Sequence, residues 1–128
     1  MENVKKNFLQ LNNIGAYKVA LELSNYIWDI VLNWDYFTKD TIGKQFVRAA
    51  DSISANIAEG FGRYAKKDKI NFYRYSYGST KESLDWNEKA KRRNLLTKDE
   101  YAHILEELVA LPKEINFLIK FTNDKLSI

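Results

Sequence analysis

Residues 45–63, which read QFVRAADSISANIAEGFGR, decide the fold expected for this chain. A set of apolar and small residues runs into and through this stretch at intervals of three or four, the spacing of the buried face of an α-helix. These residues are Ile42, Phe46, Ala49, Ile53, Ile57 and Gly60. The spacing predicts a helix with this face in the core.

A second pattern in the same stretch is polar. Arg48, Ser52, Asn56 and Glu59, which we call the polar seam, repeat at the helical spacing and continue to Arg63. They fall within an arc of roughly 80°, centred about 110° from the apolar stripe. Two interpretations stand. The seam is either a solvated flank with i,i+4 pairs, or it is partly buried and finds partners on a neighbouring helix or a second subunit, because unpaired buried charges are costly.

The composition is typical of one compact helical domain. The 128 residues include no cysteine, one proline and five glycines. The length suffices for a core, and the lack of cysteine excludes disulfides and thiolate metal sites. No membrane-spanning stretch and no secretion signal are visible, so we expect a cytoplasmic protein.

Charge is distributed unevenly along the chain. Basic and acidic residues number four and five in residues 1–43, twelve and six in 44–93, and four and six in 94–128, which gives net charges of −1, +6 and −2. Contact with a polyanion is therefore expected in the middle of the chain.

Apolar periodicity predicts helices over about 15–34, 40–61, 66–92 and 98–123. We expect a flexible lead-in over 1–13 and a single domain over 14–126, folded as an all-α, antiparallel up-down-up-down four-helix bundle. Asn12 or Asn13 could cap the first helix.

Several residues mark the ends of the other helices. Thr38 or Asp40 could cap the second helix, and Gly60 and Gly62 are expected to end it with a left-handed backbone. Thr97 to Glu100 form a capping box at the start of the fourth helix. Pro112 should kink that helix or split it in two.

The helix expected over 66–92 has an unusual inward face of small and polar residues. These are Phe72, Ser76, Ser79 or Thr80, Ser83, Asn87 and Ala90. Gly78, near its middle, suggests close packing, because glycine lowers helix stability. Tyr73, Tyr75, Tyr77 and Trp86 cannot all face that stripe, so we expect them to form an interface between subunits.

No catalytic, cofactor or metal site is expected. Glu100 and His103 have the spacing of a di-iron ligand pair, but His103 is the only histidine and the second pair is missing. Glu59 and Glu82 could form an acid/base pair only if they met across helices, and salt bridges explain both more simply. The sequence favours a protein that is not an enzyme.

Basic residues interleaved with aromatic ones follow the third helix, as on surfaces that bind phosphates and stack bases. The candidates for nucleic-acid binding are Arg63, Lys66, Lys67, Lys69, Arg74, Lys81, Lys89, Lys91, Arg92 and Arg93. The alternative is a solvated face that keeps the protein soluble.

The chain also resembles a known family. The motifs are Gln45-x-x-Arg48-Ala49-Ala50-x-Ser52-Ile53-x-x-Asn56-Ile57-Ala58-Glu59-Gly60-x-Gly62-Arg63, and Phe72 with Gly78-Ser79-x-x-Glu82. They are similar to those of small bacterial four-helix-bundle proteins encoded in intervening sequences of 23S ribosomal RNA, over about residues 16–120. Accessory variability proteins of diversity-generating retroelements look similar.

The resemblance implies a homopentamer with a basic surface that binds nucleic acid, and no catalytic activity. We group the motif residues Gly78, Ser79 and Glu82 with the polar seam, which we expect to align the second helix with the third or with a neighbouring subunit. The sequence departs from the family pattern just before Arg48. It has Phe46-Val47 there, where many relatives have a second arginine or another polar residue. Two functions follow: an oligomer that binds RNA through the third helix, or a protein-protein adaptor for an enzyme such as a reverse transcriptase.

Overall fold

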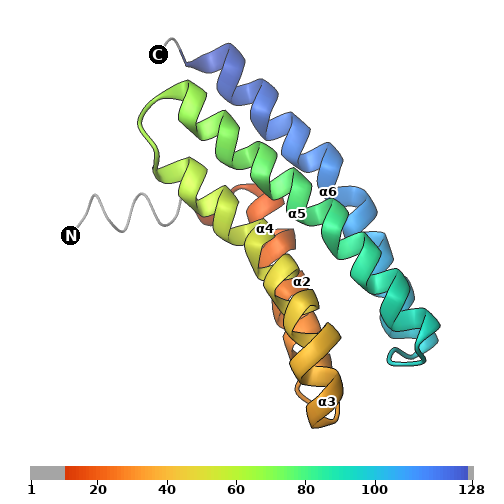
Figure 1. Cartoon of the computed structure of the whole chain (residues 1–128). Coiled ribbons are helices and arrows are strands. Elements are labelled where there is room, and N and C mark those ends of the chain that lie inside the picture. Colours follow the sequence, from red (N-terminus) through yellow and green to blue (C-terminus); the bar gives the residue numbers. More distant parts are fainter. Residues whose placement is uncertain (1–10, 127–128) are drawn as a thin grey trace.

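A computed structural model describes residues 11–126, and this part of the chain is helical without strands. Four long helices alternate in direction, which confirms the predicted four-helix bundle (Figure 1). The elements are α2 (Gly15–Val31), α3 (Tyr36–Thr38), a π-helical turn η1 (Lys39–Gly43), α4 (Lys44–Gly62), α5 (Lys66–Arg92) and α6 (Lys98–Lys125). The expected lead-in lies largely in residues 1–10, outside the described part.

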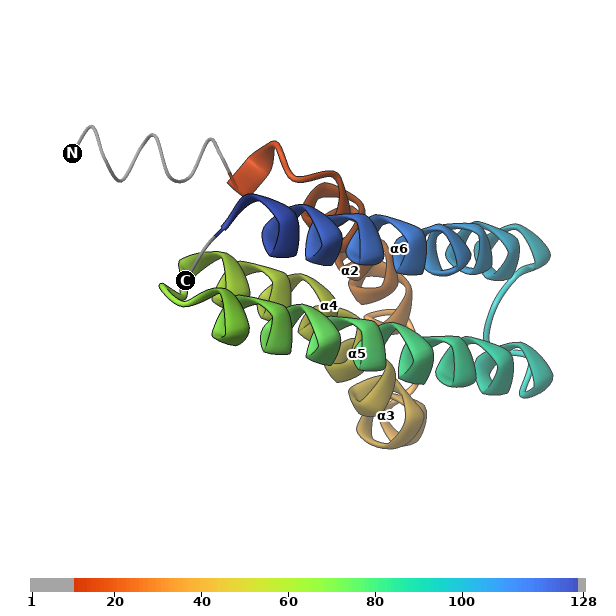
Figure 2. The ribbon, with the colours of Figure 1, turned by 90° about the horizontal axis from the view of Figure 1, so that it is seen from above.

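The four helices pack around one core, in which α4 contacts both α2 and α5, while α6 closes the bundle against α5 and α2. Figure 1 shows the α2–α4 pair and the α5–α6 pair diverging toward one end, and Figure 2 shows the same arrangement from above. The predicted stripe on α4 is buried throughout. At the diverging end, Trp34 Nε1 donates to the carbonyl of Leu95 at 3.1 Å and links the two pairs.

The buried face of α5 is the small and polar stripe that the sequence predicted. Its members are Ser76, Thr80, Ser83, Asn87 and Ala90, with Ile70 and Tyr73. Phe72, which was predicted to face inward, is only half-buried, and its neighbour Tyr73 takes the core position. Ser76 Oγ donates to the carbonyl of Ile53 at 2.8 Å, a buried hydrogen bond that joins α5 to α4. Asn87 Nδ2 reaches the carbonyl of Tyr101 at 3.4 Å on α6. Small side chains therefore let α5 pack closely between two neighbours.

The helix that leads into α4 begins earlier than expected. Asp35, not Thr38 or Asp40, is its N-cap, because Asp35 Oδ1 accepts from the amide of Thr38 at 2.8 Å. The wide turn η1 then continues directly into α4. At Gly43 an added Cβ would lie 2.8 Å from Val31 Cγ1, so glycine permits the close approach of α2.

The glycines at the end of α4 do not act as predicted. No described glycine has a positive φ, and α4 ends where Arg63 turns to an extended conformation (φ −76°, ψ 152°). Gly60 instead allows close packing, because an added Cβ would lie 2.7 Å from Tyr73 Cε1 and 2.9 Å from the carbonyl oxygen of Lys69. At Gly62 an added Cβ would meet nothing within 4 Å.

The predictions for the other helix ends and for Pro112 have different outcomes. The predicted capping box is confirmed, since Thr97 Oγ1 accepts from the amide of Glu100 and Glu100 accepts from that of Thr97. Ile14, not Asn12 or Asn13, precedes α2, and it makes no side-chain cap. Pro112 lies inside a continuous α6, so the alternative prediction that it splits this helix is wrong.

None of the described helices is long and apolar enough to cross a membrane.

Asn94 ends α5 in the left-handed region (φ 60°). The amide of Leu95 donates to the carbonyl of Ala90 at 2.9 Å, and that of Asn94 to Lys91 at 3.0 Å, the pair of bonds that defines a Schellman motif. Among residues with a Cβ, asparagine tolerates this conformation best.

Asn94→Ala is expected to lower the free energy of unfolding by about 1 kcal/mol, because alanine is strained at positive φ. Asn94→Gly should change it by less than about 0.5 kcal/mol, because glycine adopts this φ freely. Urea denaturation followed by circular dichroism measures both. Equal stability of the two variants would contradict a strained position.

Candidate nucleic-acid interface

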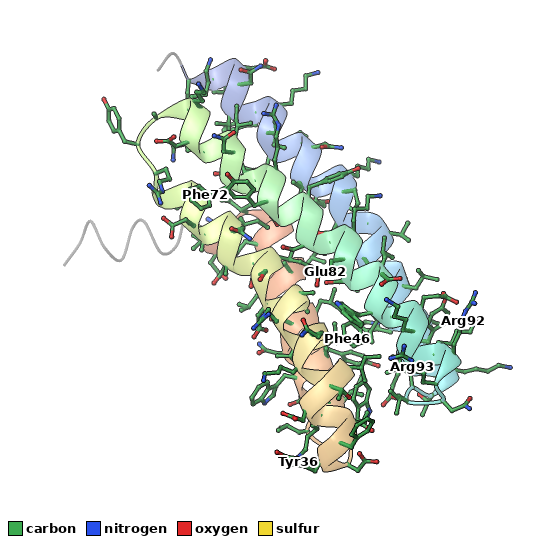
Figure 3. The ribbon with its side chains drawn as sticks, viewed as in Figure 1. Tyr36, Phe46, Phe72, Glu82, Arg92 and Arg93 are labelled. Atoms are coloured by element: carbon green, nitrogen blue, oxygen red, sulfur yellow. The ribbon has the colours of Figure 1, made fainter. Side chains whose placement is uncertain are left out.

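The ten candidate basic residues lie along α5 or just before it, and the helix spreads them over its whole length. At about 1.5 Å of rise per residue, Lys67 and Arg92 are roughly 37 Å apart. Figure 3 shows Arg92 and Arg93 at the end of α5 remote from Phe72. We divide the candidates into a first-turn cluster (Arg63, Lys66, Lys67, Lys69), a central stripe (Arg74, Lys81) and a last-turn cluster (Lys89, Lys91, Arg92, Arg93). The structure does not bring the ten together into one patch.

Most side chains of the first-turn cluster already have partners within the chain. Arg63 Nε donates to Glu59 at 3.0 Å, and the guanidinium lies 4.6 Å from the centre of the Phe72 ring. Lys69 Nζ donates to the carbonyl of Phe61 at 2.7 Å, and burial lowers the pKa of its ammonium. Lys69 therefore helps to hold the α4–α5 connection and is a weak candidate for binding a ligand.

The central stripe lies on the outer face of α5. Lys67, Arg74 and Lys81 are exposed and follow one another at seven-residue intervals, which rotate by only about 20° per step on an α-helix. Lys81 Nζ lies 5.3 Å from the centre of the Tyr77 ring, and Tyr75 is 57% exposed next to Arg74. This face presents a row of cations, and Tyr75 lies roughly 100° around the helix from Arg74.

The last-turn cluster is partly neutralised by acidic residues of α5. Lys89 pairs with Asp85 at 2.6 Å, and Arg92 with Glu88 at 3.1 Å. Glu88 also accepts from the hydroxyl of Tyr101 at 2.9 Å. This bond, and then that of Arg92, lowers the pKa of the Glu88 carboxyl.

Beside the last-turn cluster is a hollow of about 390 Å³, shared with η1 and the start of α4. Its lining residues are Asp40, Thr41, Ile42, Gln45, Trp86, Lys89 and Arg93. Lys89 Nζ lies 4.6 Å from the centre of the Trp86 ring. The sequence did not indicate that η1 and the start of α4 would meet this end of α5.

The aromatic residues expected to form an interface do not share one environment. Tyr73 is 1% exposed and packs in the core against Gly60, where burial raises the pKa of its hydroxyl to about 12. Its assignment to a subunit interface is therefore wrong. Tyr75 is exposed, while Tyr77 and Trp86 are half-buried and pack against the edge of the core.

The polar seam forms its hydrogen bonds within α4. Ser52 Oγ donates to the carbonyl of Arg48, Asn56 Nδ2 to that of Ser52, both at 2.8 Å, and Glu59 pairs with Arg63. The prediction that the seam aligns α4 with α5 is wrong within the described residues, where Ser76 makes that connection.

The α5 residues grouped with the seam are also on the surface. Gly78 is exposed, and an added Cβ would meet no atom of residues 11–126 within 4 Å, so no packing contact in this part of the chain requires glycine there. Ser79 accepts at its carbonyl from Ser83 Oγ at 2.8 Å, and Glu82 accepts from Trp86 Nε1 at 3.0 Å. These bonds are all local to α5.

A metal or acid/base centre finds no support in the described residues, where no three His, Asp or Glu side chains group around a possible ion site. The ring of His103 lies 4.5 Å from that of Tyr26, centre to centre, and Glu100 belongs to the capping box. Glu59 and Glu82 each bond to a neighbour on their own helix.

A groove between α2 and α4 was missed by the sequence reasoning. It has a volume of about 560 Å³ and combines Trp28, Leu32 and Val47 with Arg48 and Ser52 of the polar seam. A signal was present, because Leu21, Trp28 and Leu32 share one side of α2 away from its buried stripe.

Comparison with known proteins shows which family this is. The family model described as 23S rRNA-intervening sequence protein matches residues 12–117, which run from before α2 into α6. The chain belongs to this family. No curated protein matches the chain.

A solved structure has the same fold as this 23S rRNA-intervening sequence protein. It is a protein of unknown function from the S23 ribosomal protein family of Bacteroides thetaiotaomicron, with a TM-score of 0.73 and 24% sequence identity. The match covers 82% of this chain and 98% of the other. At this identity the likeness concerns the fold alone.

Proposed function

We propose that this 23S rRNA-intervening sequence protein is a non-enzymatic, self-associating bundle that binds RNA through the outer face and last turn of α5. The observation that carries the proposal is the hollow in which Lys89 and Arg93 lie beside the half-buried ring of Trp86. Cations for phosphates and an aromatic ring for bases are the two requirements of single-stranded nucleic-acid binding.

The ion pairs of the last-turn cluster do not oppose this function. Each joins residues four apart on the surface of one helix, and such pairs contribute only about 0.3–0.5 kcal/mol. A phosphate can therefore replace Glu88 as the partner of Arg92. The central stripe extends the cationic face along α5.

Self-association would strengthen this binding, because a ring of copies repeats the charge of residues 44–93 around a common axis. The exposed side chain of Tyr75, with the half-buried Tyr77, supports a contact on α5, while Trp86 is left to the hollow. Light scattering at micromolar concentration should give a mass well above 15.0 kDa. A single-chain mass would overturn this part of the proposal and leave RNA binding to be judged separately.

Reversing the charges of Arg92 and Arg93 is expected to weaken RNA binding at least tenfold, because two cations of the last-turn cluster become anions. Fluorescence anisotropy with a labelled 20-nucleotide single-stranded RNA measures the affinity at several salt concentrations. For single strands the logarithmic slope is about −0.7 per phosphate contacted, so three contacts should give a slope near −2.

The matched control is reversal of Lys113 and Lys120, two exposed lysines of α6. It makes the same change in net charge and should weaken binding less than threefold. No binding at about 50 mM salt, or equal losses in the two variants, would rule out the proposed surface.

A further inference from the structure

The groove between α2 and α4 exposes apolar surface that the bundle does not use. Trp28 is 49% exposed and Leu32 is 50% exposed, and Val47 of α4 faces them across the groove. Leu21, 37% exposed, extends the same side of α2 by two turns. A contiguous apolar surface bordered by polar residues is typical of a binding site.

The border of the groove is cationic. Lys39, Lys44 and Arg48 line it and are exposed, and within residues 11–126 none of them forms an ion pair. Asp51 is the one acidic residue of the lining, and burial raises the pKa of its carboxyl. The polar seam residues Arg48 and Ser52 thus border an apolar groove, with an excess of positive charge.

The exposed aromatic residues of α6 in a second copy are a poor match for this groove. The exposed aromatic residues of α6, Phe117 and Phe121, have a net positive set of charged residues three or four positions away on the same helix, namely Lys113, Lys120 and Lys125 with Glu114 and Asp124. Their insertion would bring those lysines against the cationic border. Opposite charges across an interface favour the partner, whereas like charges suppress it.

We propose that the groove between α2 and α4 binds an amphipathic α-helix of a partner protein, whose apolar residues pack on Trp28, Leu32 and Val47 and whose carboxylates face Lys44 and Arg48. Two packed helices leave a groove into which a third can lay side chains spaced by three, four and seven residues. This surface is separate from the basic face of α5, so the inference does not depend on RNA binding.

Two synthetic 16-residue peptides test the inference with the intact protein. Both carry the same leucine face at helical spacing, and the polar face carries Glu in one and Lys in the other. Calorimetry should give a dissociation constant on the order of 10 µM for the Glu peptide, and at least tenfold weaker binding for the Lys peptide. Amide shifts in ¹⁵N spectra should map to α2 and α4.

Variants of the groove sharpen the test. Trp28→Lys should abolish binding of the Glu peptide, and the double variant K44E/R48E should reverse the preference between the peptides. Phe117→Lys, which makes the same change at a 69% exposed aromatic residue of α6, should leave binding unchanged.

Three outcomes would overturn the inference. They are equal affinity for the two peptides, amide shifts away from α2 and α4, and a lower oligomeric mass on Trp28→Lys, which would assign the groove to a second copy. Loss of RNA binding in the α5 variants, by contrast, has no bearing on it.

Discussion

Replacing Phe46 with alanine is expected to lower the free energy of unfolding by about 3–5 kcal/mol, the usual cost of truncating a buried phenylalanine. Phe46 is fully buried on α4, in the stripe that includes Ile53 and Ile57. Alanine would remove most of the ring's contacts and leave a cavity that four packed helices can fill only in part.

Urea denaturation of Phe46→Ala at 25 °C measures this loss. Phe117→Ala on α6 is the matched control, because the same atoms are removed from a ring that is 69% exposed. We expect the control to change stability by less than about 0.5 kcal/mol. A loss below about 1 kcal/mol for Phe46→Ala would contradict its place in the core.

Gly60→Ala is expected to destabilise the protein by about 2 kcal/mol, although alanine is the better helix former by about 1 kcal/mol. The new Cβ would lie 2.7 Å from the ring of Tyr73 and 2.9 Å from the carbonyl oxygen of Lys69. Tyr73 is itself buried, so relief requires α5 to move away from α4.

Gly62→Ala is the control for this prediction, since it lies two residues later on the same helix with nothing within 4 Å of its added Cβ. It should raise the free energy of unfolding by up to about 1 kcal/mol. The two Gly→Ala changes are thus expected to have opposite signs in thermal denaturation. Stabilisation by both would show that Tyr73 and α5 move aside at little cost.

The architecture could be predicted because each helix carries its own periodic stripe. On α4 the stripe from Ile42 to Gly60 is buried, and the small, polar stripe of α5 from Ser76 to Ala90 packs inward. Periodicity gives the angle of a side chain about its own helix. It also places Tyr73 between Ile70 and Ser76 on the buried face, a signal that outweighs the tendency of aromatic clusters to form interfaces.

The periodicity of one helix does not show which residue of a neighbouring helix a side chain contacts. The contact of Gly60 with Tyr73 joins two helices, so neither helix alone reveals it. For the same reason the polar seam was wrongly expected to face α5. The start of α4 was misplaced because the π-helical turn η1 departs from the 3.6-residue period on which the prediction relied.

For the candidate site, the sequence identified residue types but not their grouping. The ten cations were recognisable from composition, yet a 27-residue helix separates its two ends by roughly 40 Å. The hollow at Trp86 depends on η1 and α4 meeting the last turn of α5, which is a tertiary contact.

The three tryptophans of this chain give each of these regions its own fluorophore. Trp28 lies in the groove, Trp34 donates from one helix pair to Leu95 on the other, and Trp86 lines the hollow of α5. Variants that keep a single indole should therefore report separately on peptide binding, on the contact between the two helix pairs, and on RNA binding. Emission from the three variants can then follow these three regions without any added label.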